Sequence, residues 1–206
     1  MRSATHNKDT EVDLRYQPFT VHLKPVVELT PDRFFELAGI NRDLRMELTA
    51  EGELLVMPPA GSESSDQNAE ITMQLRMWAK RDGTGRTFDS SGGFTLPNGA
   101  VRSPDASWVE RSKLEALTDE QRRKFAPLCP DFVIELRSPT DSLSVLRNKM
   151  VEYLDNGAKL GWLIDPEQKR VYVYQPQSEI QELHNPEKIS GDPLLSSFTL
   201  DLREIW

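Results

Sequence analysis

The chain has 206 residues, a length that suits one substantial hydrophobic core and is too short for two comfortable domains. With 37% hydrophobic and 28% charged residues, its composition is globular and excludes disordered and fibrous proteins. The formal net charge of −8 disfavours a tight, non-specific nucleic-acid binder, because such proteins usually hold phosphates through a basic face. A local basic patch is still compatible with this total.

The sequence lacks three features that would place the protein in a membrane or outside the cell. No apolar run approaches the ~20 residues that span a bilayer, and the polar segment Met1–Glu11 does not look like a signal peptide. The single cysteine, Cys129, has no internal disulfide partner. We therefore predict a protein of the reducing cytoplasm with no membrane partner. Residues 1–24 are polar and lack periodicity, which predicts a flexible arm followed by one domain over residues 25–206.

The first predicted elements are a helix and a hairpin. Thr30 is an N-cap residue followed by Pro31 at the first helical position, and Gly39 ends this helix. Two short strands, Arg45–Thr49 and Glu53–Met57, follow with a glycine in the turn between them, as in a hairpin.

A longer helix and a β-rich block come next. Apolar periodicity predicts an amphipathic helix over Ser64–Arg81, with Ser65 or Asp66 as its cap. The block Arg86–Glu110 is β-rich and contains an Asn-Gly hairpin signal at 98–99.

The second half of the chain alternates strands and helices. The strand Asp131–Leu136 is almost continuously apolar, which predicts burial on both faces. The other predicted elements are helices over Lys113–Leu117, Asp119–Phe125 and Asp141–Asn156, and strands over Leu160–Asp165, Arg170–Tyr174 and Ile180–Leu183. This order predicts an α/β domain with a mixed sheet.

Two carboxylates occupy positions suited to chemistry. Asp105 enters a strand directly after Pro104, and Glu135 lies near the end of an apolar strand, where an unpaired charge is costly. If the two strands are neighbours, the carboxylates converge on one point. Such oxygen ligands suit Mg²⁺ or Mn²⁺, which activate a phosphoryl group and a water for hydrolysis.

A nearby cation would stabilise the charge that develops in such a reaction. Two residues after Glu135 stands Arg137, which can contact a phosphate but stays protonated. Lys149, on the following helix and one turn from Tyr153, is the nearest suitable lysine. Glu70 is a further accessory candidate, through an outer contact to water at the metal.

Each candidate also has a purely structural interpretation. Asp105 fits a turn after a proline, Glu135 could pair with Arg137 or Arg102, and Lys149 could be a solvated helix residue. The three histidines are scattered, so neither a histidine zinc site nor a Ser-His-Asp triad is indicated.

Several segments together carry a family resemblance: residues 89–99, 102–106, 129–141, 149–150, Tyr153 and 161–166. Through them the run from about Thr30 to Trp206 resembles the Uma2 family of restriction endonuclease-like proteins, in the PD-(D/E)XK nuclease superfamily. The resemblance implies a restriction-endonuclease-like core, a mixed, curved sheet flanked by helices with additional hairpins. It also implies that Asp105 and Glu135 are metal ligands and that Lys149 replaces the lysine absent from position 137.

The residues and the resemblance together predict a Mg²⁺-dependent (or Mn²⁺-dependent) endonuclease acting on DNA, with no organic cofactor. Cleavage of both strands needs two sites, which predicts a homodimer. The alternative is a nuclease-fold protein that binds nucleic acid or a protein partner with little cleavage. The acidic net charge and Arg137 favour that alternative. Hydrolysis of small phosphoesters is a third possibility.

Overall fold

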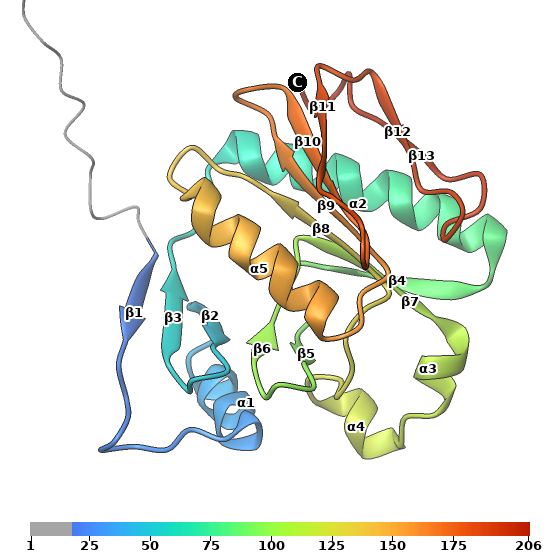
Figure 1. Cartoon of the computed structure of the whole chain (residues 1–206). Coiled ribbons are helices and arrows are strands. Elements are labelled where there is room, and N and C mark those ends of the chain that lie inside the picture. Colours follow the sequence, from blue (N-terminus) through green and yellow to red (C-terminus); the bar gives the residue numbers. More distant parts are fainter. Residues whose placement is uncertain (1–17) are drawn as a thin grey trace, which may run out of the picture.

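The structure, a computed structural model, describes residues 18–206 (Figure 1). Its centre is a six-stranded sheet formed by β4 (Gly85–Asp89), β7 (Ala106–Glu110), β8 (Phe132–Leu136), β9 (Leu160–Asp165), β10 (Arg170–Tyr174) and β11 (Gln181–His184). The strand order is β11-β10-β9-β8-β7-β4; β8 and β9 run parallel and the other neighbours are antiparallel. The predicted mixed sheet is confirmed.

The two longest helices cover opposite faces of this sheet: α2 (Ser62–Asp82) packs on one and α5 (Leu143–Asp155) on the other (Figure 1). Successive residues of β8 serve the two faces alternately, as the pleat requires. Ile134 belongs to the core cluster under α2, and Val133 belongs to the cluster under α5. The continuous apolar run of β8 therefore follows from its burial on both sides.

A second, antiparallel sheet lies beside the first and contains the predicted hairpin. It has the order β1-β3-β2-β6-β5 and consists of β1 (Phe19–Val21), β2 (Arg45–Leu48), β3 (Leu54–Met57), β5 (Phe94–Thr95) and β6 (Val101–Arg102). Helix α1 (Pro31–Ile40) packs Phe34 into its core. The predicted Thr30 cap is present and accepts a hydrogen bond from the Arg33 N–H. The Asn-Gly turn joins β5 to β6, with Gly99 at φ +89°.

Strand β1 differs from the prediction, because it lies inside the segment expected to be an arm. It pairs with β3 through backbone hydrogen bonds although its side chains are exposed, so it needs no apolar periodicity. The part of that prediction concerning residues 1–17 lies outside the described residues.

The remaining elements are α3 (Arg111–Glu115), α4 (Asp119–Arg123) and an unpredicted strand pair, β12 (Lys188–Ser190) and β13 (Thr199–Asp201). The predicted caps of the long helix are wrong. It begins at Ser62 after Gly61, and the Ser65 N–H already bonds to the Gly61 carbonyl. Among the described residues, no helix is long and apolar enough to cross a membrane.

Candidate metal centre

Strands β7 and β8 bring Asp105 and Glu135 to the same end of the central sheet. The two strands are antiparallel neighbours with Ala106 opposite Ile134. One residue further along this register, Asp105 stands opposite Glu135. The two carboxylates were expected to converge if their strands were neighbours, and the strands are neighbours.

Asp105 is held from two directions. Its Oδ1 accepts a hydrogen bond from the Arg45 guanidinium at 2.9 Å, and its Oδ2 accepts one from the backbone N–H of Leu136 at 2.9 Å. The residue is only 6% exposed. Because both oxygens already have donors, the carboxylate is fixed in orientation without a ligand.

Glu135 is buried more deeply, with 3% exposure, and one of its oxygens carries two donors. The Tyr153 hydroxyl donates to Oε1 at 2.9 Å, and the Lys149 ammonium lies 2.9 Å from the same atom. Burial raises the pKa of Glu135 to about 7; Lys149 opposes this shift, and the neighbouring Asp105 and Glu47 carboxylates add to it.

Helix α5 presents Lys149 and Tyr153 one turn apart, so both side chains reach the end of β8. The Lys149 ammonium also bonds to Glu47 Oε1 at 2.9 Å. Burial by itself lowers the pKa of Lys149, but Glu135 and Glu47 outweigh it and raise this pKa. Lys149 is therefore a protonated, largely buried cation between two carboxylates.

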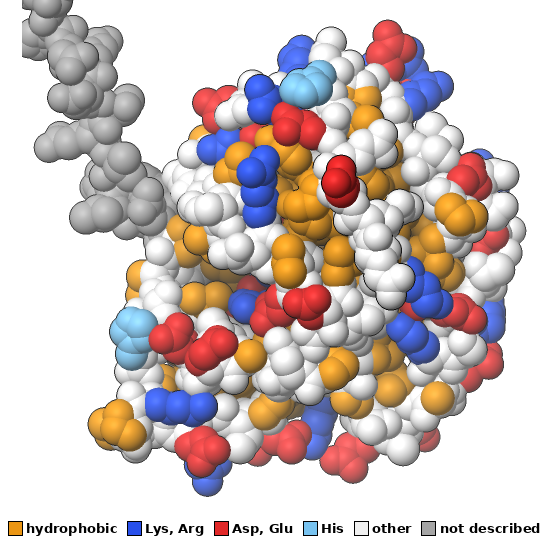
Figure 2. Space-filling view, viewed as in Figure 1, with side chains coloured by type: hydrophobic (Ala, Val, Ile, Leu, Met, Phe, Trp, Pro, Cys, Tyr) orange, Lys and Arg blue, Asp and Glu red, His pale blue; other side chains and the backbone are white. Residues whose placement is uncertain are grey.

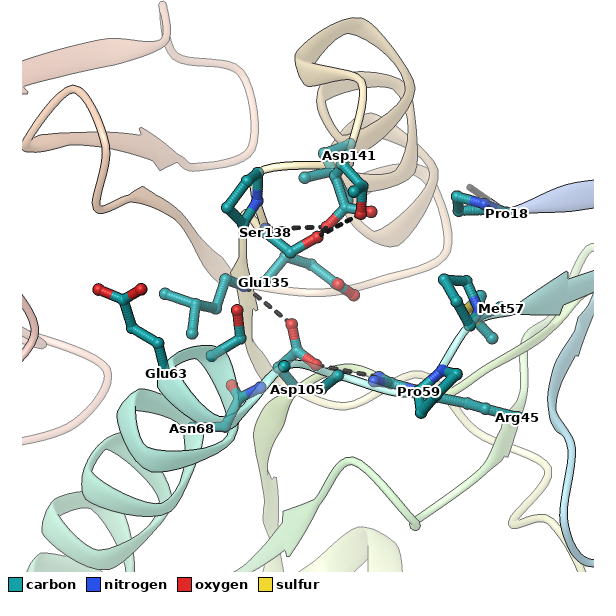
Figure 3. Close-up of a pocket in the computed structure, with 18 of the residues that line it drawn as sticks. Pro18, Arg45, Met57, Pro59, Glu63, Asn68, Asp105, Glu135, Ser138 and Asp141 are labelled. Carbon is teal, nitrogen blue, oxygen red and sulfur yellow. Dashed lines mark hydrogen bonds and ion pairs between the residues drawn. The ribbon is translucent and has the colours of Figure 1, made fainter. Parts of the chain in front are cut away.

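These groups line a cavity of about 420 Å³. Its walls come from the ends of β7 and β8, the loop before α2, the loop before α5, and the side chains of Arg45 and Lys149. In Figure 3, Asp105 and Glu135 lie together in the cavity with the Asn68 side chain of α2 beside Asp105, while Glu63 points away.

The donor atoms fit a hard divalent cation. The described residues contain no cluster of three or more histidine, cysteine, aspartate or glutamate side chains suited to a metal. Asp105 and Glu135 are the two buried carboxylates that line the cavity. Two carboxylates suit Mg²⁺ or Mn²⁺, which retain waters and add substrate phosphate to their ligands. Asn68 also lines the cavity, and its buried Oδ1 has no hydrogen-bond partner among the described residues.

The two accessory candidates lie elsewhere. Arg137 pairs with Asp165 at 2.7 Å and lines a different cavity, so it is not beside Glu135. Glu70 accepts a hydrogen bond from Gln74, which also bonds to the backbone of Asp201 in β13. Glu70 is not part of the Asp105 cavity wall; Asn68, half a turn earlier on α2, is.

Strand β2 supplies two charged groups that sequence reasoning missed. Arg45 and Glu47 alternate with Met46 and Leu48, which lie in the core of the second sheet. This alternation was the available signal: it puts both charged side chains on one face of β2. The pattern does not show that this face meets Asp105 and Lys149 rather than solvent.

The fold is shared with a solved nuclease-like protein. The crystal structure of a protein from Anabaena variabilis, described as "a putative nuclease belonging to DUF820", superposes with a TM-score of 0.71 at 24% sequence identity. The match covers 85% of this chain and 96% of that one. Together with the mixed sheet and its flanking helices, it places the chain in the restriction-endonuclease-like fold class.

The sequence model of the Uma2 family, described as "Putative restriction endonuclease", matches residues 31–203. The chain belongs to the Uma2 family, as its sequence motifs predicted. A comparison with curated proteins found no match.

Proposed function

We propose that this protein is a Mg²⁺-dependent or Mn²⁺-dependent endonuclease that hydrolyses DNA phosphodiester bonds at the Asp105–Glu135 cavity. The observation that carries the proposal is the meeting of two buried carboxylates with one lysine ammonium, 2.9 Å from Glu135, in the wall of a cavity. Membership of a family described as restriction endonucleases supports the same reaction class.

Each residue has a distinct part in the proposed reaction. Asp105 and Glu135 hold the metal, which, when bound, supplies electrophilic activation of the phosphoryl group and the attacking water. Lys149 is protonated, so it stabilises negative charge on the phosphate rather than accepting a proton. Asn68 lines the same cavity beside Asp105 and adds a neutral polar group to its wall. Arg137 has no part, because Asp165 neutralises it.

The charge distribution sets a condition on substrate binding. In Figure 2, Lys and Arg side chains are scattered among Asp and Glu over the face shown, with no continuous basic surface there. The candidate cavity is lined by more carboxylates than cations: Asp105, Glu135 and Asp141, with Glu63 pointing away, against Arg45 and Lys149. A phosphate therefore needs the divalent cation in order to enter, so we expect DNA affinity to depend on metal.

A second candidate function is binding without efficient cleavage. Arg45 occupies Asp105 Oδ1 and the Leu136 N–H occupies Oδ2, so a metal must share oxygens that already have donors. A weak metal site of this kind would leave a DNA-binding or protein-binding domain on a nuclease fold.

Cleavage assays separate the two candidates. Supercoiled plasmid, single-stranded DNA and single-stranded RNA are incubated with purified protein and Mg²⁺ or Mn²⁺, beside Glu135→Gln and Lys149→Met. We expect metal-dependent cutting of DNA that both variants lose. Linearised rather than nicked plasmid would indicate the homodimer that double-strand cleavage needs. No cutting with either metal would favour the binding function.

A further inference from the structure

A second buried glutamate, Glu47, contacts the same Lys149 ammonium as Glu135. It is 2% exposed. Its Oε1 accepts from the Lys149 ammonium and from the Ser103 N–H, each at 2.9 Å, and its Oε2 lies 3.2 Å from Arg102. Three donors on two oxygens leave this carboxylate little freedom to turn.

Arg102 connects Glu47 to the helix that carries Lys149. The Arg102 Nε donates to Glu152 at 2.6 Å while its Nη1 contacts Glu47. Glu152 belongs to α5, one turn after Lys149 in the helix. These ion pairs therefore begin at Lys149 on α5, pass through Glu47 on β2 and Arg102 on β6, and return to α5 at Glu152. They hold the Lys149 side chain against the second sheet.

Lys149 borders two neighbouring cavities. It lines the Asp105–Glu135 cavity and also a second cavity of about 800 Å³, whose wall includes Glu47, Arg102 and Glu152. The Lys149 side chain is only 12% exposed, and both Glu47 and Glu135 lie 2.9 Å from its ammonium. Its place depends on the two carboxylates that share its ammonium.

The two carboxylates are not equivalent. Burial tends to raise the pKa of Glu47, but Lys149, Arg102 and the Ser103 N–H outweigh burial and lower it. Glu47 therefore keeps its negative charge. Glu135, in contrast, is a proposed metal ligand, and a divalent cation on its carboxylate competes with Lys149 for the same oxygens.

We propose that Glu47 is the positioning residue for Lys149, which it anchors at the Asp105–Glu135 cavity with or without metal on Glu135. This inference rests on the proposed function and adds to it a division of labour: Glu135 serves the metal and Glu47 serves the lysine. Glu47 itself touches neither metal nor substrate.

The test compares Glu47→Gln, Glu47→Asp and a matched control, Asp131→Asn. Glutamine keeps the size and an oxygen acceptor but removes the charge, whereas aspartate keeps the charge on a shorter side chain. Asp131 is another fully buried carboxylate that contacts two lysines, Lys113 and Lys159, and it does not line the Lys149 cavities.

The first readout needs neither metal nor cleavage. In ¹⁵N-lysine-labelled protein, the protons of a hydrogen-bonded, buried ammonium exchange slowly with water, so the ammonium gives an NMR signal. The signal that is missing from the Lys149→Arg spectrum is that of Lys149. We expect this signal in the wild type and in Asp131→Asn, and its loss or marked shift in Glu47→Gln. An unchanged Lys149 signal in Glu47→Gln would overturn the proposal.

The second readout is kinetic. We expect Glu47→Gln to lower kcat about 10- to 100-fold, the usual range for loss of an outer partner, with little change in KM for DNA. Glu47→Asp should recover part of kcat, and Asp131→Asn should unfold at a lower temperature with kcat retained. A wild-type kcat in Glu47→Gln overturns the proposal. If the wild-type protein cleaves nothing, the proposed function fails, and the NMR signal alone decides whether Glu47 anchors Lys149.

Discussion

Asp105 accepts a hydrogen bond from the backbone N–H of Leu136, the residue that follows Glu135. The carboxylate at the start of β7 is thereby tied to the backbone of β8, next to the other carboxylate of the site. Because the bond uses a main-chain donor, any residue except proline at position 136 can supply it. The spacing of the two carboxylates is consequently a property of the sheet.

Loss of the charge at position 105 should strongly weaken metal binding without unfolding the protein. In Asp105→Asn the amide oxygen still accepts from the Leu136 N–H, so we expect the fold to be kept. Outer partners of a metal ligand are worth about 10- to 100-fold in affinity, so loss of a ligand should weaken Mn²⁺ binding at least about 100-fold. Calorimetric titration with Mn²⁺ measures this. Equal affinity in wild type and variant would remove Asp105 from the metal site.

The hydroxyl of Tyr153 should matter for both stability and metal affinity. It is fully buried and donates to Glu135 Oε1. Hydrogen bonds to charged groups contribute about 1.5–3 kcal/mol, so we expect Tyr153→Phe to lower the free energy of unfolding by about that amount. Mn²⁺ affinity should fall about tenfold, because the ligand loses an orienting partner.

Tyr174→Phe is the matched control, since the Tyr174 hydroxyl is buried in the same core cluster with no hydrogen-bond partner among the described residues. Its removal should cost little stability and leave Mn²⁺ affinity unchanged. Urea unfolding of both variants gives the comparison. Equal losses from the two hydroxyls would contradict a specific role for the Tyr153 contact.

Titration of Glu135 should make the free energy of unfolding depend on pH. Its pKa in the folded protein is about 7, above the ordinary value of 4.5, chiefly because of burial. Between these values the folded state binds more protons than the unfolded state. The stabilisation from protonated Glu135 is therefore complete below the lower value and is lost as the pH rises through about 7, with a slope of at most about 1.4 kcal/mol per pH unit.

Glu135→Gln has no titrating group at this position and should lack that component. The free energies of unfolding of the wild type and the variant are measured with urea from pH 5 to pH 8, with a chelator to remove metal. Their difference is the pH-dependent contribution of Glu135. If the two proteins show parallel pH profiles, Glu135 is not the buried acid that titrates near neutrality.

Asp131 should affect stability with the opposite pH dependence and no effect on metal. Burial tends to raise its pKa, but the Glu110 N–H, Lys113 and Lys159 outweigh burial and lower it. Its contribution is present above the ordinary pKa and is lost as the pH falls through the lowered one. We expect Asp131→Asn to cost about 1.5–3 kcal/mol at pH 7, with the deficit shrinking in acid. Thermal unfolding at pH 7 and in acid, with Mn²⁺ titration of the same proteins, checks this prediction. A change in Mn²⁺ affinity in Asp131→Asn would contradict it.

The sequence by itself indicated most of the helices and strands and the two candidate carboxylates. Asp105 after a proline and Glu135 in an apolar strand are local signals, and burial of β8 on both faces follows directly from its composition. Lys149 and Tyr153 share a helix face through their spacing of four residues, which is also local. The family match over residues 31–203 agrees with the segments that carried the resemblance.

Only the tertiary structure decided which charges meet. Lys149 and Glu47 are 102 residues apart, and Arg45 and Asp105 are 60 apart, so no periodicity within one element relates them. Arg137 was a plausible partner for Glu135 by spacing, but it turns to Asp165 on β9. The physical reason is that periodicity shows which face of a strand or helix a side chain occupies. The opposing charge that stabilises a buried ion comes from whichever element packs against that face.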